Sequence, residues 1–80
     1  MSRSWPIRLR KGELFRVLYV GSSRGTVDGQ GRNVHCTGRR LGELHRTAWQ
    51  CWVENYGATE RIESVHVKIV TLDQVMAEGR

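Results

Sequence analysis

Three histidines and two cysteines are the side chains of this sequence best suited to catalysis or to metal binding. His35 adjoins Cys36, and His45 lies six residues before Cys51. Six residues span about 240° around a helix, so His45 and Cys51 cannot hold one ion together without distortion. None of these residues follows a zinc-ligand spacing. We therefore expect no metal site and no cofactor, and we expect His45 to be a core-edge histidine satisfied by a hydrogen bond.

Catalytic patterns are equally weak. His35, His45 and His66 fall on three different predicted elements, and no two acidic residues have a spacing suited to acid–base chemistry. A dyad of Cys36 with a histidine is conceivable, but no motif supports it. The glycine-rich segment 22–31 lacks the lysine and the strand-to-helix context of a phosphate-binding loop. The sequence therefore predicts a protein that is not an enzyme.

Arginine dominates the charged residues. The chain has 80 residues and a net charge of +5, and its basic residues are eleven arginines and two lysines. Residues 1–46 hold ten of these against three acids, whereas residues 47–80 hold three against five. Arginine suits bidentate recognition of phosphate or carboxylate, although a GC-rich genome would also favour its codons. We predict a basic partner-binding face formed by Arg8, Arg10, Arg24, Arg32, Arg39 and Arg40, with Trp49 as an apolar anchor.

The segment from Arg39 to Gly57 is the only long stretch with a clean helical period. At 100° per residue one face carries the apolar side chains, which predicts an amphipathic helix packed on a sheet through Leu41, Leu44, Ala48 and Trp52. Gly57 is expected to end this helix in the left-handed conformation. Its start is less defined, because Thr37 or Gly38 could cap it and Gly42 weakens the first turn.

Arg39 and Arg40 would lie at the positive end of the helix dipole, where cations are disfavoured. An anion or an acidic partner would relieve that arrangement. The alternative is a pair of solvated arginines in a loop, which costs little when both are exposed.

Four segments alternate apolar and polar residues in the manner of strands, namely Trp5–Arg10, Glu13–Gly21, Arg32–Thr37 and Arg61–Val70. Pro6 places the first at an edge, and two mostly apolar faces make the second central. Thr71 and Gln74 fit a capping box that opens a short C-terminal helical turn. The sequence predicts a single α+β domain over residues 1–80, with a small, mainly antiparallel sheet in the order β-β-β-α-β and one long helix on one face.

The other face of this sheet has no second long helix to cover it. It would carry one of the two apolar rows of segment 13–21, either Phe15, Val17 and Tyr19 or the row that includes Leu14 and Leu18. Aromatic side chains on an open sheet could stack bases. Half-open apolar faces often mark partner interfaces, which leaves a homodimer open as well.

The chain has no run of apolar residues approaching the roughly 20 that span a membrane. Its N-terminus is basic but lacks the apolar core of a secretory signal. We therefore expect a cytoplasmic protein without a membrane partner. In a reducing compartment Cys36 and Cys51 are expected as free thiols, although a bridge stays open if strand and helix juxtapose them.

The chain resembles the small single-domain proteins of bacteriophages and mobile elements, including anti-CRISPR proteins. The resemblance rests on its short arginine-rich sequence, on the layout of a sheet with one helix and on the lack of catalytic or metal motifs. The resemblance implies an inhibitor of a host protein or ribonucleoprotein complex, acting in the host cytoplasm by blocking a nucleic-acid-binding surface. We therefore expect a non-enzymatic inhibitor of this kind, acting through its basic face. The alternative is a small basic nucleic-acid-binding protein or regulator, although no known binding signature is visible.

Overall fold

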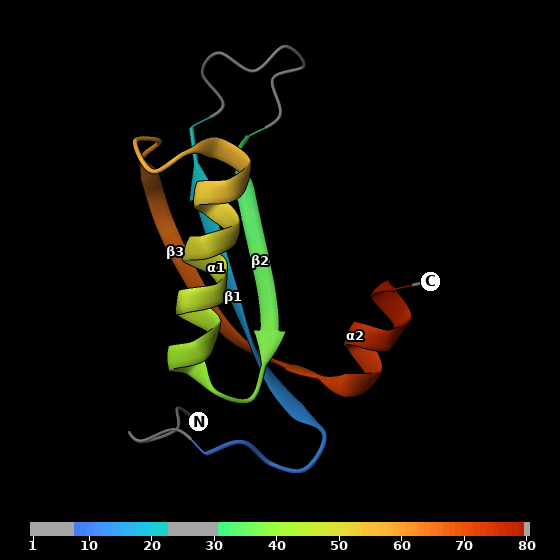
Figure 1. Ribbon diagram of the computed structural model, residues 1–80. Coiled ribbons are helices and arrows are strands. Elements are labelled where there is room, and N and C mark those ends of the chain that lie inside the picture. Colours follow the sequence, from blue (N-terminus) through green and yellow to red (C-terminus); the bar gives the residue numbers. More distant parts are fainter. Residues whose placement is uncertain (1–7, 23–30, 80) are drawn as a thin grey trace.

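The computed structural model describes residues 8–22 and 31–79, and in these ranges a three-stranded antiparallel sheet carries one long helix on one face (Figure 1). The strands are β1 (Glu13–Gly21), β2 (Asn33–Gly38) and β3 (Ile62–Thr71). The helices are α1 (Leu41–Tyr56) and the short α2 (Leu72–Glu78). The sheet order β2-β1-β3 makes β1 central, as its two mostly apolar faces predicted. The α+β class and the single long helix on one face are confirmed.

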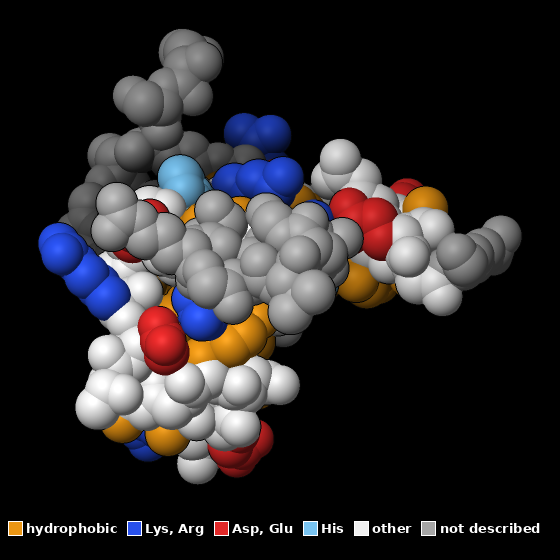
Figure 2. Space-filling model, turned by 90° about the horizontal axis from the view of Figure 1, so that it is seen from above, with side chains coloured by type: hydrophobic (Ala, Val, Ile, Leu, Met, Phe, Trp, Pro, Cys, Tyr) orange, Lys and Arg blue, Asp and Glu red, His pale blue; other side chains and the backbone are white. Residues whose placement is uncertain are grey.

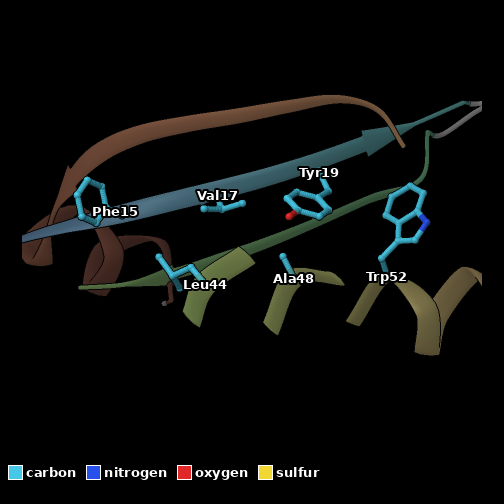
Figure 3. Packing of buried hydrophobic residues seen from close by; sticks show 6 residues of the cluster. All are labelled: Phe15, Val17, Tyr19, Leu44, Ala48 and Trp52. Atoms are coloured by element: carbon cyan, nitrogen blue, oxygen red, sulfur yellow. The ribbon is translucent and has the colours of Figure 1, made fainter. Parts of the chain in front are cut away.

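The core forms between β1 and α1 (Figure 3). Side chains two apart on a strand share a face, and side chains four apart on a helix do the same. These two periods bring together six buried residues, which are Phe15, Val17, Tyr19, Leu44, Ala48 and Trp52. Val17 and Trp52 are completely buried, and burying a large apolar side chain contributes about 1.5–3 kcal/mol. This cluster therefore fixes the helix on the sheet.

Residues close in sequence determine where α1 begins and where it ends. Arg40 takes the N-cap position without a capping side-chain hydrogen bond, because Thr37 and Gly38, the two expected caps, belong to β2. At the other end Gly57 has a φ of 96° and donates its N–H to the carbonyl of Val53. A residue with a side chain would be strained there. The prediction that Gly57 ends the helix is confirmed, but its ψ of 155° differs from the left-handed helical conformation that was expected.

The first predicted strand is wrong where the structure describes it. Trp5, Pro6 and Ile7 lie outside the described residues, and Arg8 to Arg10 belong to no strand. Arg10 instead enters a tight turn in which its N–H donates to Glu13 Oε1 at 2.7 Å and its carbonyl accepts from the Glu13 N–H at 3.0 Å. Gly12 has a φ of 81° in this turn. Leu9 packs against the core cluster, so its apolar side chain serves packing without pairing as a strand.

The C-terminal helix α2 begins with the predicted capping box. Thr71 Oγ1 accepts from the Gln74 N–H at 3.1 Å, and Gln74 Oε1 accepts from the Thr71 N–H at 2.8 Å. The Leu72 N–H also donates to the carbonyl of Gly12 at 2.7 Å. No residue of α2 is buried, so polar contacts hold this helix, at its first turn and through Glu78 at its last residue. Neither described helix is long and apolar enough to cross a membrane.

Candidate anion-binding surface

The structure gathers four of the six predicted arginines at one end of the molecule. Residues 8–12 run below the start of α1 in Figure 1, which brings the N-terminal arginines toward those that precede the helix. We call this surface the basic end and define it as the exposed side chains of Arg8, Arg10, Lys11, Arg39 and Arg40. It combines two stretches of sequence that lie almost thirty residues apart.

Glu13 links the two stretches of the basic end. Its carboxylate accepts from the Arg10 N–H, while its carbonyl accepts from Arg39 Nη1 at 3.4 Å. Arg40 Nη1 lies 3.4 Å from Glu43 Oε1, and both side chains are mostly exposed, at 81% and 69%. Such an exposed pair contributes at most about 1 kcal/mol. Arg40 can therefore turn to an incoming anion at little cost.

A groove adjoins the basic end along the edge strand β2. It encloses about 500 Å³ between β2 and the first turns of α1. Its lining includes Arg39 and Arg40 together with Glu43, Leu44 and Thr47 of the helix. Because β2 is an edge strand, its outer backbone groups have no strand partner within the described sheet. An extended chain or a nucleic-acid backbone could lie along this groove beside the two arginines.

The remaining residues predicted for the partner-binding face lie elsewhere. Arg24 falls outside the described residues. Arg32 sits at the far end of β2, where Nη1 donates to the carbonyl of Ser22 at 3.2 Å and lies 3.7 Å from Glu60 Oε2. Its side chain is only 22% exposed, so we assign it a structural role. The predicted single basic face is therefore divided between two ends of the molecule.

Trp49 is exposed, as an apolar anchor requires, but it lies apart from the basic end. It is 44% exposed and lies about 100° around α1 from the buried Ala48. That flank is opposite Thr47, which lines the groove with β2. Trp49 therefore lies on the side of β3, where Val65 and Val67 are also exposed, at 47% and 45%.

The aromatic residues of β1 are not a stacking platform. Phe15 and Tyr19 are only 6% and 8% exposed beneath α1, so the idea that they stack bases on an open sheet is wrong. Tyr19 Oη instead lies 2.8 Å from His45 Nδ1. This contact satisfies His45 as a core-edge histidine, as predicted. Burial raises the pKa of the Tyr19 hydroxyl, so this hydroxyl stays protonated at neutral pH.

The two cysteines are free thiols on facing elements. Burial, and then the neighbouring thiol of Cys51, raises the pKa of the Cys36 thiol. A thiol whose pKa is raised is a weak nucleophile, which disfavours a catalytic dyad at Cys36. Within residues 8–22 and 31–79, no three His, Cys, Asp or Glu side chains come together to hold a metal ion.

The sheet face opposite α1 carries a group of basic residues that the sequence interpretation did not single out. The strand register sets His35 and His66 on either side of Leu18, and sets Lys68 beside Arg16. Seen from above in Figure 2, a histidine and Lys/Arg side chains gather on the side of the sheet away from α1. The sequence does show His66 and Lys68 in the polar row of segment 61–70, but only the strand register places this row beside Arg16.

This face also differs from the expected open apolar face. Of the two rows left open by the sequence, the row of Leu14, Leu18 and Val20 lies on this face, but each of its residues is partly buried. The helix α2 also reaches this face through the ion pair between Arg16 and Glu78. The exposed apolar row lies on the helix side instead. There Val65 and Val67 pair with Tyr19 and Val17, and α1 packs mainly over β1 and β2.

Comparison of the chain with protein-family models, with curated proteins and with solved structures finds no match.

Proposed function

We propose that this chain is a non-enzymatic binding protein that uses its basic end to bind the phosphate backbone of nucleic acid. The observation that supports the proposal is the convergence of Arg8, Arg10 and Lys11 with Arg39 and Arg40 at one end of the molecule. Among the described residues, Glu13 contacts Arg10 and Arg39, and Glu43 contacts Arg40. Arginine and lysine that neutralise phosphates release bound counterions, and this release drives sequence-independent binding.

The kind of recognition follows from what the basic end lacks. Its five defining side chains include no aromatic group, and Phe15 and Tyr19 are buried under α1. The described part of the basic end therefore offers no platform for base stacking, and contacts with phosphate position a protein without specifying sequence. We expect binding that is strongly dependent on salt and tolerant of sequence.

The resemblance to phage-encoded inhibitors suggests a second candidate function, which is binding to a host complex. A nucleic-acid-binding surface is itself basic, and like charges across an interface oppose association. A basic inhibitor would therefore contact the nucleic acid of such a complex or an acidic protein surface. The groove along β2 favours an acidic protein segment, because an extended chain could add to the strand edge beside Arg39 and Arg40.

Fluorescence anisotropy with labelled 20-nucleotide DNA and RNA of mixed sequence tests the leading proposal. We expect binding of both, and a loss of at least tenfold in affinity when Arg39→Glu and Arg40→Glu are combined. Arg61→Glu changes an exposed arginine just before β3, away from the basic end, and is the control. The thermal midpoint of the double variant should stay near that of the parent.

Two outcomes would count against the proposal. Equal losses in the double variant and in Arg61→Glu would show a general charge effect. Absence of binding at 50 mM salt would exclude the nucleic-acid function. A pull-down from a bacterial host lysate then tests the inhibitor function. Recovery of a stoichiometric protein complex that survives nuclease treatment would support it, provided that Arg39→Glu with Arg40→Glu abolishes the complex.

A further inference from the structure

The sheet face opposite α1 contains a pocket of about 330 Å³, which we call the open-face pocket. Its lining residues are Arg16, Leu18, His35, His66, Lys68 and Glu78. Three strands and α2 contribute to it, and four of its six side chains are cationic or become cationic on protonation. The pocket lies on a different surface from the basic end and is argued independently of it.

The strand register explains why these cationic groups meet. Arg16 lies directly opposite Lys68 in the antiparallel pair of β1 with β3. Directly opposed residues have Cβ atoms about 4.5–5.5 Å apart, and like charges in such positions destabilise the sheet. Two residues further along β1, on the same face, Leu18 is flanked by His35 of β2 and His66 of β3. The strands therefore hold like charges together, and an anion between them would relieve the repulsion.

The structure shows one anion already in place. Glu78 of α2 forms a bidentate ion pair with Arg16, in which Arg16 Nη1 donates to Glu78 Oε1 at 3.1 Å and Arg16 Nη2 contacts Glu78 Oε2. The hydrogen bond from Arg16 is the main cause that lowers the pKa of Glu78, and the positive charges of Arg16, Lys68 and His35 lower this pKa further. A carboxylate thus occupies the position that a tetrahedral oxyanion could take.

The carboxylate leaves part of this site unsatisfied. Arg16 Nε is buried without a hydrogen-bond partner among the described residues, and the Arg16 side chain is only 15% exposed. An unpaired buried donor is costly. A phosphate group carries at least one more free oxygen and up to one more negative charge than a carboxylate, and charge-assisted hydrogen bonds to arginine are strong. The pocket therefore offers a phosphate more partners than Glu78 uses.

The position of Glu78 at the end of α2 would allow its carboxylate to move out of the pocket. It lies at the last residue of α2, a helix with no buried residue. Leu72 and Met76 of this helix are 48% and 58% exposed. Its first turn is attached independently of Glu78, through the capping box and the hydrogen bond from the Leu72 N–H to the carbonyl of Gly12. The far end can move away while the first turn stays attached.

We propose that the open-face pocket binds a phosphate group and that Glu78 occupies the pocket as an internal competitor when no phosphate is present. The phosphate can be a free ion or the terminal phosphate of a larger molecule. Arg16 and Lys68 supply the fixed positive charge. His35 supplies a ring N–H donor on one side of Leu18, and His66, whose Nε2 lies 3.1 Å from Ser64 Oγ, lines the other side.

Titration of the ¹⁵N-labelled chain with inorganic phosphate, followed by NMR, tests the proposal. We expect saturable shifts at the amides of residues 16–18, 35, 66–68 and 78. Glu78→Gln should bind phosphate about tenfold more tightly, because the competing charge is gone, and Lys68→Gln should bind about tenfold more weakly. Lys68 is exposed, so its replacement should leave folding intact.

Arg46→Gln is the matched control, since it removes one exposed positive charge from α1 outside the pocket. Weakening by Arg46→Gln equal to that by Lys68→Gln would overturn the proposal, and so would unchanged affinity in Glu78→Gln. A 5′-phosphorylated dinucleotide and its unphosphorylated form separate the two sources of phosphate. Tighter binding of the phosphorylated dinucleotide than of the free ion would assign the pocket to a terminal phosphate, and equal binding would assign it to the ion. Arg39→Glu with Arg40→Glu should leave the affinity for inorganic phosphate unchanged, so the proposals for the basic end and for the pocket can fail separately.

Discussion

Gly21, at the end of β1, is the position where one added methyl group should damage this fold most clearly. A Cβ at Gly21 would lie 2.5 Å from Cη2 and 2.9 Å from Cζ2 of the Trp52 indole. It would also lie 3.0 Å from the carbonyl oxygen of Arg61. Separations of this size lie well inside van der Waals contact, so either the ring or the β3 backbone must move.

Neither neighbour can move freely. The Trp52 ring is fully buried, and its Nε1 donates to the carbonyl of Glu60 at 3.1 Å. The carbonyl of Arg61 belongs to the backbone that leads into β3. Overpacking of this kind costs about 1–3 kcal/mol. For a domain of this size each kcal/mol lowers Tm by roughly 4–8 °C, so Gly21→Ala should melt at a clearly lower temperature.

Urea denaturation followed by tryptophan fluorescence measures the effect, and Gly42→Ala is the matched control. A Cβ at Gly42 meets nothing within 4 Å, and alanine favours a helix over glycine by up to about 1 kcal/mol. The same chemical change should therefore destabilise at one glycine and stabilise at the other. If Gly21→Ala were as stable as the parent protein, the placement of Trp52 over the end of β1 would be refuted.

Three smaller perturbations test separate contacts. Tyr19→Phe removes the hydroxyl that bonds His45 at 2.8 Å and should cost about 0.5–1.5 kcal/mol in urea denaturation; an unchanged midpoint would argue against that bond. Because burial raises the pKa of the Cys36 thiol, iodoacetamide at pH 8 should modify it more slowly in the folded than in the unfolded chain, and equal rates would contradict its packing. Arg16 holds the pKa of Glu78 below its ordinary value of 4.5, so their ion pair is fully present above that pH and is lost as the pH falls through the lowered pKa. NMR shifts of α2 should therefore stay constant down to pH 4.5 and change only below it, whereas a change that begins at higher pH would disagree.

Local periodicity was enough to predict the elements of the fold. The alternation in β1, the 100° period of α1 and the capping box at Thr71 each depend on neighbours in sequence, and all three are confirmed. The segment that ends at Arg10 shows the limit of such patterns. Its alternation suited a strand, but Glu13 and the positive φ of Gly12 turn the chain before Arg10 can pair. A competing turn is invisible to a count of alternating residues.

The candidate surfaces depend on long-range placement, which the sequence does not contain. Arg39 and Arg10 were expected on one face, and they do lie at one end, because Glu13 accepts from the Arg10 backbone N–H and from the Arg39 guanidinium. Arg32 was expected beside them, but the length of β2 carries it to the other end of the sheet. The meeting of Arg16 with Lys68 needed the register of β1 with β3. Composition thus indicated a basic surface, whereas topology decided which arginines share it.

The salt dependence of nucleic-acid binding tests the central claim most directly. Each phosphate neutralised on a duplex contributes about −0.9 to the slope of the logarithm of the association constant against the logarithm of salt concentration. With three to five contacts from the basic end, we expect a slope of about −3 to −4.5 on a mixed-sequence duplex. Arg39→Gln combined with Arg40→Gln should reduce its magnitude by about two, and Arg61→Gln should leave it unchanged. A slope near zero, or one that the double variant does not alter, would contradict the assignment of the basic end as the binding surface.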